Sequence, residues 1–339
     1  MSSKRCAILG ATGMVGQRFV ELLSRTKEFD ISALYASERS AGKNYREACH
    51  WVLDSEMPES VADMIVMNDL KGIDADVFFS ALPSGTAGDV ERRLASEGKV
   101  VCSNARDNRM ADDVPLVIPE VNPEHLELIK GKRGYIVANP NCSTIILCMA
   151  LKPLYDFGIE AVSVTTMQAL SGAGYPGVAS LDIENNVIPF IANEEEKMES
   201  EPLKIYGRLR RNRIEKAGFK ISASCTRVNV IEGHTISIQL KLRDKPSIDE
   251  IKDAYRDFRG LPQELKLPLA PERPVILREE QDRPQPRKDL ADGFSISVGR
   301  VRRDEVLGYK LFAVGSNTVR GAAGAGILNA ELLKALHYL

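Results

Sequence analysis

The sequence predicts an α/β protein with two domains, the first built on a parallel sheet and the second, an α+β domain, on a mixed, mainly antiparallel sheet. Three observations lead to this fold class. The chain has 339 residues, more than one hydrophobic core usually supports. Up to about residue 140, short apolar strands alternate with helical patterns, which is typical of parallel sheets. Longer alternating strands with short connections follow, and they favour antiparallel pairing.

The first domain begins with a strand at residues 5–10, a tight turn and a helix at 14–23. Further strands are expected at residues 31–36, 76–80 and 99–103, with a helix at 86–96. The second domain is expected to contain strands at 161–170, 220–231, 235–243, 294–302 and 307–315, and helices at 144–157, 194–209 and 248–259. Short connections such as Glu232-Gly233 predict hairpins between successive strands.

Two further segments complete the expected architecture. The proline-rich stretch 261–286 is expected to be extended and to cross between elements or subunits. The final stretch 321–339 predicts a helix of small and apolar residues that returns to the first domain. The division is therefore 1–141 with 320–339 for the first domain and 142–319 for the second.

Composition and charge exclude several classes of protein. Apolar residues make up 44% and charged residues 27%, which is ordinary for a globular chain. A net charge of -2 gives no electrostatic reason to expect nucleic acid or an anionic membrane as a partner. We expect a cytoplasmic protein, because the chain lacks a long apolar run and a signal peptide. The six cysteines show no metal-ligand spacing, so we expect thiols and no metal site.

A glycine motif, Gly10-Ala-Thr-Gly13-Met-Val-Gly16, lies between the first strand and the first helix. Glycines there permit a tight turn and a close approach of the backbone to a pyrophosphate, which the helix N-terminus attracts. The motif predicts a dinucleotide site, with a tight loop that binds nothing as the alternative.

The second strand is followed by Ser37-Glu38-Arg39-Ser40, which bears on the choice of cofactor. An acidic residue favours the ribose of NAD, whereas arginine and serine suit a 2′-phosphate. We predict NADP, because Arg39 lies between the hydroxyl groups of Ser37 and Ser40. Solvated loop charge is the alternative.

The segment Asn139-Pro-Asn-Cys142-Ser-Thr opens a helix that Ser143 and Thr144 could cap. A helix N-terminus stabilises a thiolate and offers N–H groups to an oxyanion, so Cys142 is a candidate nucleophile. A packed thiol is the alternative.

The chain has four histidines that could assist this cysteine. His50 and His125 lie in polar stretches and His337 near the C-terminus, where we expect solvated rings. His234 follows Gly233 between two expected strands and is the best candidate, with an exposed turn histidine as its alternative.

These motifs, together with Gln168-Ala-Leu-Ser-Gly-Ala-Gly174 and Arg227-Val-Asn-Val-Ile-Glu-Gly-His234, resemble the aspartate-semialdehyde dehydrogenases, specifically their archaeal and fungal-like branch. The resemblance covers essentially the whole chain. It implies NADP-dependent interconversion of L-aspartyl 4-phosphate with L-aspartate 4-semialdehyde and phosphate, in the synthesis of lysine, threonine, methionine and isoleucine. It also implies a thioester on Cys142, an acid/base role for His234, and a catalytic and dimerisation domain that forms a homodimer or homotetramer.

The resemblance further assigns the groups that hold the substrates. Arg227 holds the α-carboxylate and Gln168 orients the substrate, while Arg109 and Lys197 bind phosphate. Glu194 receives the α-amino group because it lies one helical turn from Lys197, although Glu195 and Glu196 remain alternatives. The cofactor residues from motif and resemblance together are Gly10, Thr12, Gly13, Met14, Val15, Ser37, Arg39, Ser40, Ser171, Gly172 and Asn317. Asn317 could bond the nicotinamide amide, or could simply cap a helix.

Three rival functions remain at this point. A malonyl-CoA reductase would use the same cysteine and NADPH, but would not need Glu194 or the Asn-Pro-Asn-Cys motif. An N-acetyl-glutamyl-phosphate reductase would carry an aromatic signature in place of Ser143-Thr144. A nucleotide-binding regulator without catalysis would not need to keep the cysteine, histidine and cationic residues together.

Overall fold

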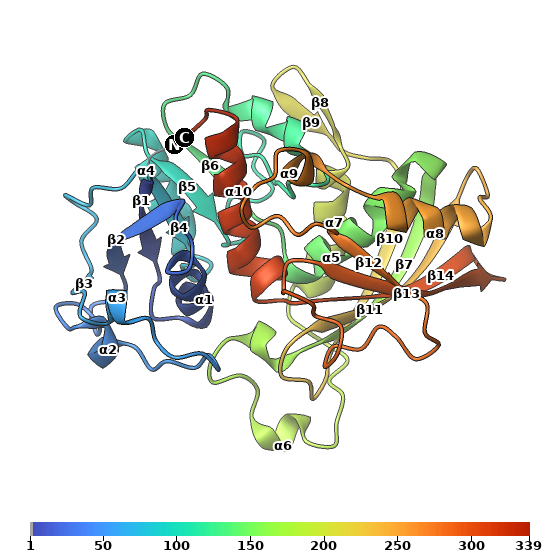
Figure 1. Ribbon diagram of the computed structural model, residues 1–339, viewed down its shortest axis with the longest axis horizontal. Coiled ribbons are helices and arrows are strands. Elements are labelled where there is room, and N and C mark those ends of the chain that lie inside the picture. The colour runs from blue at the N-terminus through green and yellow to red at the C-terminus, as the bar shows by residue number, and fades with distance from the viewer. Residues whose placement is uncertain (1–2) are drawn as a thin grey trace.

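The computed structural model describes residues 3–339 and contains two six-stranded sheets (Figure 1). In the first sheet all strands are parallel, in the order β3-β2-β1-β4-β5-β6. Its strands are β1 (Lys4–Leu9), β2 (Phe29–Tyr35), β3 (Val66–Met67), β4 (Val77–Ser80), β5 (Val100–Ser103) and β6 (Tyr135–Ala138). The strand order reverses direction between β1 and β4. Parallel sheets of this kind bind ligands at that point, outside the carboxyl ends of the strands. The expected parallel sheet is confirmed, although β3 and β6 were not predicted.

Helices cover the first sheet, and the end of the chain supplies one of them. The helices within this half are α1 (Met14–Leu23), α2 (Tyr45–Ala48), α3 (Glu59–Ala62), α4 (Ala87–Ser96) and the 3-10 helix η1 (Pro123–Ile129). From the C-terminus, η4 (Val319–Ala323) and α10 (Gly324–Ala335) pack against α1, β4 and β5. A Cβ at Gly326 would come within 2.9 Å of the Phe19 ring, which explains the small residue there. The expected return of the last helix is confirmed.

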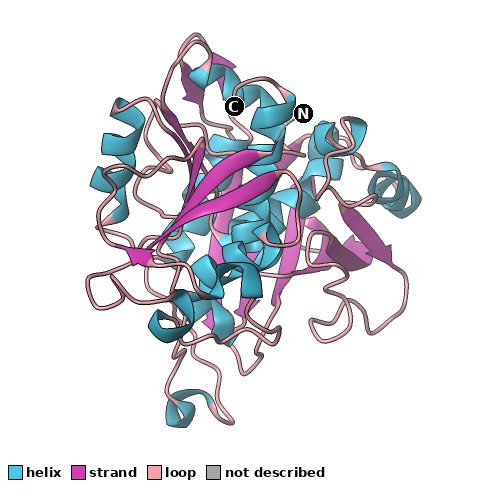
Figure 2. Cartoon of the chain, turned by 60° about the vertical axis from the view of Figure 1, so that its left-hand side comes forward, coloured by secondary structure: helices cyan, strands magenta, loops and turns pink. Residues whose placement is uncertain are grey.

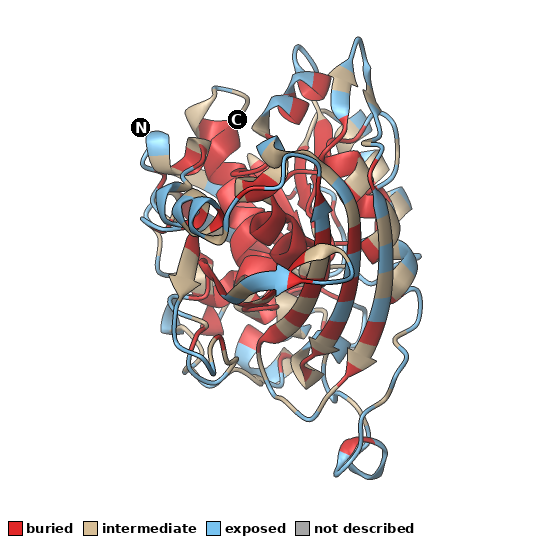
Figure 3. Cartoon of the chain, turned by 90° about the vertical axis from the view of Figure 1, so that its right-hand side faces the viewer, coloured by how far each residue is buried: buried red, intermediate tan, exposed pale blue. Residues whose placement is uncertain are grey.

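The second sheet has the order β10-β7-β11-β14-β13-β12. Its strands are β7 (Ile159–Gln168), β10 (Lys220–Arg227), β11 (His234–Leu242), β12 (Val275–Arg278), β13 (Ile296–Asp304) and β14 (Gly308–Gly315). The two outer pairs, β10–β7 and β12–β13, are parallel and the inner pairs are antiparallel, as expected for a mixed sheet. Buried and exposed residues alternate along these strands (Figure 3), so only one face is covered.

The helices of the second half lie between the two sheets or on the covered face. They are α5 (Cys142–Leu151), which continues as η2 (Lys152–Phe157), α7 (Glu194–Ile205) and α8 (Ile248–Asp257). Every residue of α5 after Cys142 is buried, because the helix contacts β11, β13 and β14 on one side and η4 on another. A helix that is apolar all round is typical of such a central position.

Two predictions about the second half were wrong. The expected hairpin through Glu232-Gly233 does not form, because β10 pairs with β7 and β11 lies on the other side of β7. The proline-rich stretch is only partly extended, since it begins with the helix α9 (Leu261–Glu264), although it also contains the extended strand β12. A small hairpin of β8 (Arg208–Arg210) and β9 (Arg213–Glu215) was not predicted.

A long connection, residues 169–193, joins β7 to α7 and extends away from the rest of the chain (Figures 1 and 2). It carries η3 (Leu170–Ala173) and α6 (Ser180–Ile183). It begins directly after Gln168 and ends directly before Glu194, so a predicted site residue adjoins each of its ends. Within residues 3–339, no helix combines the length and the apolar character needed to cross a membrane.

Candidate active site

Three predicted site residues lie at one end of the second sheet. Gln168 ends β7, Arg227 ends β10 and pairs with Gln168 across the parallel ladder, and His234 begins the antiparallel strand β11. The order β10-β7-β11 therefore brings Arg227 and His234 to either side of Gln168. Helix α5 begins opposite them with Cys142.

The start of α5 is capped by Asn141 rather than by Ser143 or Thr144. The Asn141 side-chain oxygen accepts hydrogen bonds from the N–H groups of Ser143 at 3.0 Å and Thr144 at 3.2 Å. The prediction was wrong because both residues lie inside the first helical turn, whereas the extended residue before the helix supplies the cap. Two N–H groups that could have bound an oxyanion are thus already occupied.

Cys142 and His234 form a close pair. The cysteine Sγ lies 3.2 Å from Nε2 of the ring. Nδ1 on the other side of the ring accepts a hydrogen bond of 3.1 Å from the backbone N–H of Ala169. His234 is fully buried, so the alternative of an exposed turn histidine is wrong.

The surroundings keep both members of this pair uncharged. Burial raises the pKa of the Cys142 thiol to about 12, and Glu194 acts in the same direction, while Lys197 and Arg109 oppose it. Burial lowers the pKa of His234 to about 3, and the nearby charge of Arg227 adds to the effect. The resting site therefore holds a thiol and a neutral imidazole. Burial thus opposes the stabilisation that the helix N-terminus offers to a Cys142 thiolate.

Glu194 is the buried carboxylate of the site. One of its oxygens accepts from Asn141 Nδ2 at 2.7 Å and from Gln168 Nε2 at 3.1 Å, and the other pairs with Lys197. Burial alone would raise the pKa of Glu194, but Lys197 and the amide donors outweigh it, so the pKa lies below its ordinary value. Glu195 instead accepts from the Cys225 N–H and Glu196 is exposed, which favours Glu194 as the amine ligand.

A second buried carboxylate, Glu201, lies two turns further along α7, and the sequence prediction missed it. Its Oε1 accepts from Arg109 at 2.9 Å, and its Oε2 accepts from the Asn141 N–H at 2.7 Å. Its separation of seven residues from Glu194 places both on one helix face and is the signal that could have found it. Arg109 also donates to the Asn104 carbonyl. A cavity of about 400 Å³ is lined by Arg109, Lys197 and Glu201 among others, so the two expected phosphate residues share one space.

The predicted site residues from the neighbouring loops and strands lie together around His234. Arg227 donates to the Ala169 carbonyl at 2.7 Å. A Cβ at Gly172 would lie 2.9 Å from the Arg227 guanidinium and 3.1 Å from the His234 ring. Asn317 accepts from the Gly233 N–H at 2.9 Å and donates to the Ser171 hydroxyl at 2.8 Å, so it links two loops and is not a plain helix cap.

The glycine motif forms an open loop at the carboxyl end of β1. Gly10 has a φ of +78°, and a Cβ there would lie 2.6 Å from the Ala81 carbonyl oxygen. A Cβ at Gly16 would lie 2.1 Å from the Gly10 oxygen, whereas one at Gly13 meets nothing nearer than 3.5 Å. Gly13 precedes α1 and has no side chain to cap it, so the first N–H groups of Met14 and Val15 are available to a ligand. This arrangement fits a pyrophosphate.

The predicted 2′-phosphate residues lie beside this loop. The N–H groups of Gly10 and Ala11 donate to the Tyr35 carbonyl at the end of β2, so the loop adjoins the segment that follows β2. There, a turn closes with a hydrogen bond of 2.9 Å from the Ser40 N–H to the Ser37 carbonyl. Arg39 is exposed on this turn and Ser40 is buried. The residues therefore suit an anionic group next to the dinucleotide.

Among the other histidines, the prediction for His125 was wrong. It is fully buried, with Nδ1 bonded to Asn122 and Nε2 to the Gly207 carbonyl. Burial lowers its pKa, so it acts as a packed polar residue. His50 and His337 are exposed as expected. All cysteines except Cys142 are buried.

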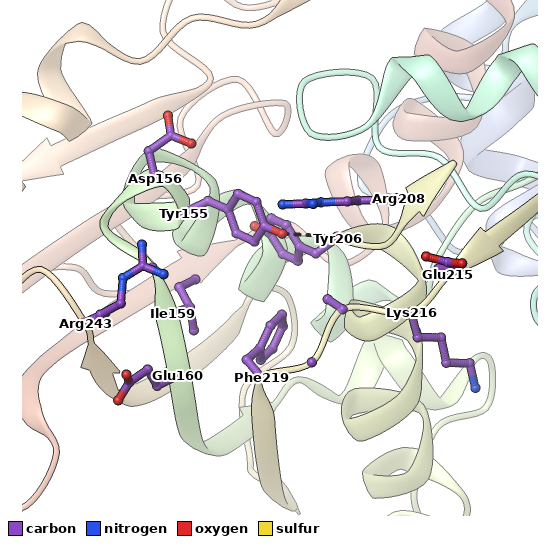
Figure 4. Close-up of a pocket in the computed structure, with 13 residues that line it drawn as sticks. Tyr155, Asp156, Ile159, Glu160, Tyr206, Arg208, Glu215, Lys216, Phe219 and Arg243 are labelled. Atoms are coloured by element: carbon purple, nitrogen blue, oxygen red, sulfur yellow. Dashed lines mark hydrogen bonds between the residues drawn. The ribbon is translucent and has the colours of Figure 1, made fainter. Parts of the chain in front are cut away.

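The largest cavity described lies away from this site, at the opposite end of β7 and β10. It has a volume of about 660 Å³ and is lined by residues near the start of both strands and by Arg208. Figure 4 shows the rings of Tyr155 and Tyr206 stacked on one another in its lining, with centroids 4.6 Å apart. Cationic and acidic side chains alternate around the opening, so the cavity does not select one sign of charge.

The fold and the comparisons together define a class: an NAD(P)-dependent dehydrogenase. Residues 5–129 match the family model described as semialdehyde dehydrogenase, NAD binding domain, and residues 151–320 match the semialdehyde dehydrogenase, dimerisation domain. Association between copies is therefore a family property of the second segment.

Relatives give the particular family. The aspartate-semialdehyde dehydrogenases of Archaeoglobus fulgidus and Methanothermobacter thermautotrophicus are each 52% identical to the chain; the matches cover 96% of this chain and 96% and 97% of those proteins, respectively. The crystal structure of the Candida albicans enzyme with NADP shares 40% identity, covers 100% of both chains and superposes with a TM-score of 0.94. The chain belongs to the aspartate-semialdehyde dehydrogenase family.

Proposed function

We propose that the protein is an NADP-dependent aspartate-semialdehyde dehydrogenase that converts L-aspartyl 4-phosphate to L-aspartate 4-semialdehyde and phosphate, and the reverse, through a thioester on Cys142. The observation that carries the proposal is the Cys142–His234 contact of 3.2 Å at the start of α5, beside Arg227 and the Glu194–Lys197 pair. A nucleophile thus meets fixed partners for a carboxylate, an amine and a phosphate in one place.

The chain's own groups account for the substrate. Arg227 presents a planar guanidinium that can bind the α-carboxylate with two parallel bonds. Glu194 carries a negative charge that can receive the α-amino group, and Gln168 touches the same carboxylate. Sulfur attack at the acyl carbon forms the thioester and releases phosphate, which the cavity beside Arg109 and Lys197 can hold.

The cofactor is NADP in this proposal, and its bound nicotinamide supplies or accepts the hydride. The open N–H groups at Met14 and Val15 would hold the pyrophosphate at the bare backbone of Gly13, with Gly10 and Thr12 shaping the loop. Arg39 with Ser37 and Ser40 would hold the 2′-phosphate. Ser171, Gly172 and Asn317 lie beside His234, where they would position the nicotinamide end.

The same proposal covers the assembly and setting of the protein. The NADP-binding domain consists of residues 1–141 and 320–339, and the catalytic and dimerisation domain of residues 142–319. The uncovered face of the second sheet supports a homodimer or a homotetramer. A cytoplasmic setting agrees with free thiols at all six cysteines, including the reactive one.

The test is an assay of NADP reduction by the purified protein with L-aspartate 4-semialdehyde, with and without inorganic phosphate. We expect NADPH to form only when phosphate is present, and Cys142→Ser to lose at least about 1,000-fold in kcat. A reaction that ignores phosphate or survives in Cys142→Ser would refute the thioester. A parallel assay with malonyl-CoA and NADPH tests for malonyl-CoA reductase activity. Rapid NADPH oxidation in that assay would show that malonyl-CoA, and not the aspartate derivative, is the substrate.

A further inference from the structure

Helix α7 carries a row of charged residues that alternate in sign along one of its faces. They are Glu194, Lys197, Glu201 and Lys204, which are separated by three or four positions. The first three bind or line the expected substrate and phosphate site. Lys204 is also buried, but it does not line the cavity beside Arg109. Its charge therefore needs an explanation of its own.

The ammonium group of Lys204 binds three carbonyl groups of one main-chain segment, residues 109–114. Its Nζ donates to the carbonyl oxygens of Arg109 and Ala111 at 2.7 Å each, and to that of Val114 at 2.9 Å. An ammonium group has three N–H donors and no acceptor, so these bonds use every donor it has. The segment belongs to the first half of the chain and α7 to the second, so Lys204 connects the two halves.

The carbonyl groups of this segment have few other partners. Residues 109–114 form no helix or strand. Within residues 3–339, no other group donates a hydrogen bond to the carbonyl of Arg109 or of Val114. A buried carbonyl without a donor is unfavourable, so the path of the segment depends on the Lys204 ammonium.

The same segment carries Arg109, one of the two expected phosphate ligands. Glu201, one helical turn before Lys204, accepts from the Arg109 guanidinium at 2.9 Å, while Lys204 binds the Arg109 carbonyl. Helix α7 therefore holds both the side chain and the main chain of this arginine. Lys197 lies on the same helix and lines the same cavity as Arg109. One helix thus sets the position of the two cations relative to each other.

We propose that Lys204 is a positioning residue for phosphate: its bonds to the main chain hold the Arg109 guanidinium where it can bind one phosphate group together with Lys197. The inference rests on the proposed function, in which these two cations hold phosphate. Lys204 does not touch the phosphate and acts through Arg109. The alternative is a buried cation that only stabilises the fold, and its loss would not affect phosphate more than the other substrates.

The surroundings of Lys204 determine when it carries its charge. The titratable groups near it, from its own helix and from the neighbouring segments, are Glu201, Asp112, Asp113, Lys216 and His125. Burial, with Lys216 acting in the same direction, lowers the pKa of Lys204 to about 8, while the three carboxylates oppose this shift. The ammonium with its three bonds is thus the form at neutral pH. Above about pH 8 it loses a proton, and with it one donor.

The direct test is steady-state NADPH formation by Lys204→Met at varied concentrations of inorganic phosphate. Methionine keeps most of the side-chain volume but donates no hydrogen bond. We expect the KM for phosphate to rise by about 10- to 100-fold, because a displaced guanidinium binds an anion less well. The KM values for the semialdehyde and NADP, and kcat at saturating phosphate, should change by less than about threefold. An unchanged KM for phosphate, or an equal rise in all three KM values, would overturn the proposal.

Lys334→Met is the matched control. Lys334 is 5% exposed, against 4% for Lys204, and it also lies on a helix, α10. It pairs with Glu28 at 2.7 Å and does not line the phosphate cavity. Its substitution removes a buried ammonium of equal exposure, so the variant should lose stability but keep its KM for phosphate. A rise in that KM as large as in Lys204→Met would contradict a specific role for Lys204.

Lys204→Gln provides a second test if the methionine variant does not fold. Glutamine retains two N–H donors for the carbonyl groups but does not titrate. In the wild type, the KM for phosphate should rise above about pH 8 as Lys204 loses its proton. In Lys204→Gln the KM should be higher at neutral pH and should lack this rise. The same pH dependence in both proteins would refute the role of the ammonium group.

Phosphate binding without catalysis separates this inference from the proposed function. Broadening of the ³¹P NMR signal of inorganic phosphate reports binding in the absence of the other substrates, and Arg109→Gln shows how much of it arises at this site. We expect less broadening by Lys204→Met than by the wild type or Lys334→Met. Equal broadening by all three would sink the inference and leave the proposed function standing. A wild type that binds phosphate but forms no phosphate-dependent NADPH would instead refute the proposed function.

Discussion

The two halves of the site differ in how their polar groups are satisfied before a ligand arrives. At the glycine loop the N–H groups that begin α1 have no side-chain cap, and Arg39 is exposed. Around Cys142 nearly every polar group is bonded within the chain: Glu194 has three donors, Arg109 has Glu201, and Arg227 has a carbonyl. We call the glycine loop, with its uncapped N–H groups, the cradle. We call the hydrogen-bonded residues around Cys142 the network.

This difference predicts how each half discriminates between ligands. A dinucleotide entering the cradle gains bonds without breaking any, so its affinity follows the charge and shape of the loop. A substrate entering the network must replace internal partners, such as Lys197 at Glu194 or the Ala169 carbonyl at Arg227. An analogue that lacks one of its charged groups would leave a buried partner unsatisfied, and this makes the network the more selective half.

The largest effect is expected for Glu201→Gln, which breaks the network at a buried carboxylate. The variant leaves the Arg109 guanidinium buried without its counter-charge, a loss of about 3 to 5 kcal/mol in the free energy of unfolding. It also weakens the anchor on the Asn141 N–H, so kcat should fall. Denaturant unfolding and steady-state kinetics measure both. Glu196→Gln, exposed on the same helix, is the control, and equal stability of the two variants would show that Arg109 does not depend on Glu201.

The next effect compares two glycines of the cradle. Gly16→Ala places a methyl group where backbone atoms already lie, so the loop must move and stability should fall by about 1 to 3 kcal/mol. Gly13→Ala makes only an ordinary contact with the Gly10 oxygen, so its stability should change by no more than about 1 kcal/mol. It should nevertheless weaken NADP binding by about tenfold, because its methyl group occupies the approach of the phosphates. Denaturant unfolding measures the loss of stability, and fluorescence titration with NADP measures the loss of affinity. Unchanged NADP binding in Gly13→Ala would show that the phosphates do not approach the loop at Gly13.

Arg39→Ala tests the charge at the edge of the cradle. Removing a cation that bonds the 2′-phosphate should lower kcat/KM for NADP by about 10- to 100-fold, while kcat/KM for NAD stays nearly constant. The fold should be unaffected because Arg39 is exposed. Arg46→Ala, another exposed arginine nearby in the sequence, is the control. Equal losses with both cofactors would remove Arg39 from the 2′-phosphate site.

The cradle was predictable from the sequence and the network was not, for a physical reason. A glycine turn between a strand and a helix is encoded within a few neighbouring residues, so Gly10 to Gly16 indicate it locally. The contacts of the network join residues far apart, for example Cys142 with His234, 92 positions later. Such contacts depend on the strand order, which the sequence predicted wrongly for β10. The resemblance supplied the residues of the reaction but not their internal partners.

Glu201 and His125 illustrate what remained hidden. Glu201 lies in a run of similar carboxylates, and apart from its spacing from Glu194 the sequence does not distinguish it; its contact with the Asn141 N–H does. His125 has polar neighbours in the sequence, yet Asn122 and the Gly207 carbonyl satisfy its ring in the interior. Local polarity predicts exposure only where no distant partner is available.

The smallest predicted effect concerns Glu331 on α10, a buried carboxyl group that lacks such a network. It accepts from the Leu269 N–H, and its other oxygen finds no partner within residues 3–339. Burial raises the pKa of Glu331 to about 7, whereas the donors at Glu194 hold that pKa below its ordinary value. Because the folded pKa lies above the unfolded one, the folded state retains a proton that the unfolded state has released. The stability it contributes is present at acidic pH and is lost as the pH rises through about 7.

Glu331→Gln stays neutral and keeps an oxygen for the Leu269 N–H, so it should not show this loss. Between about pH 6 and pH 8, the free energy of unfolding of the variant should rise by about 1.4 kcal/mol relative to wild type. Urea unfolding at several pH values measures the difference, with Glu97→Gln on the surface as the control. Parallel curves for wild type and Glu331→Gln would mean that the group is already ionised in the folded protein. A single N–H would then suffice to hold a buried carboxylate, and the three donors at Glu194 would have to serve substrate binding rather than its charge.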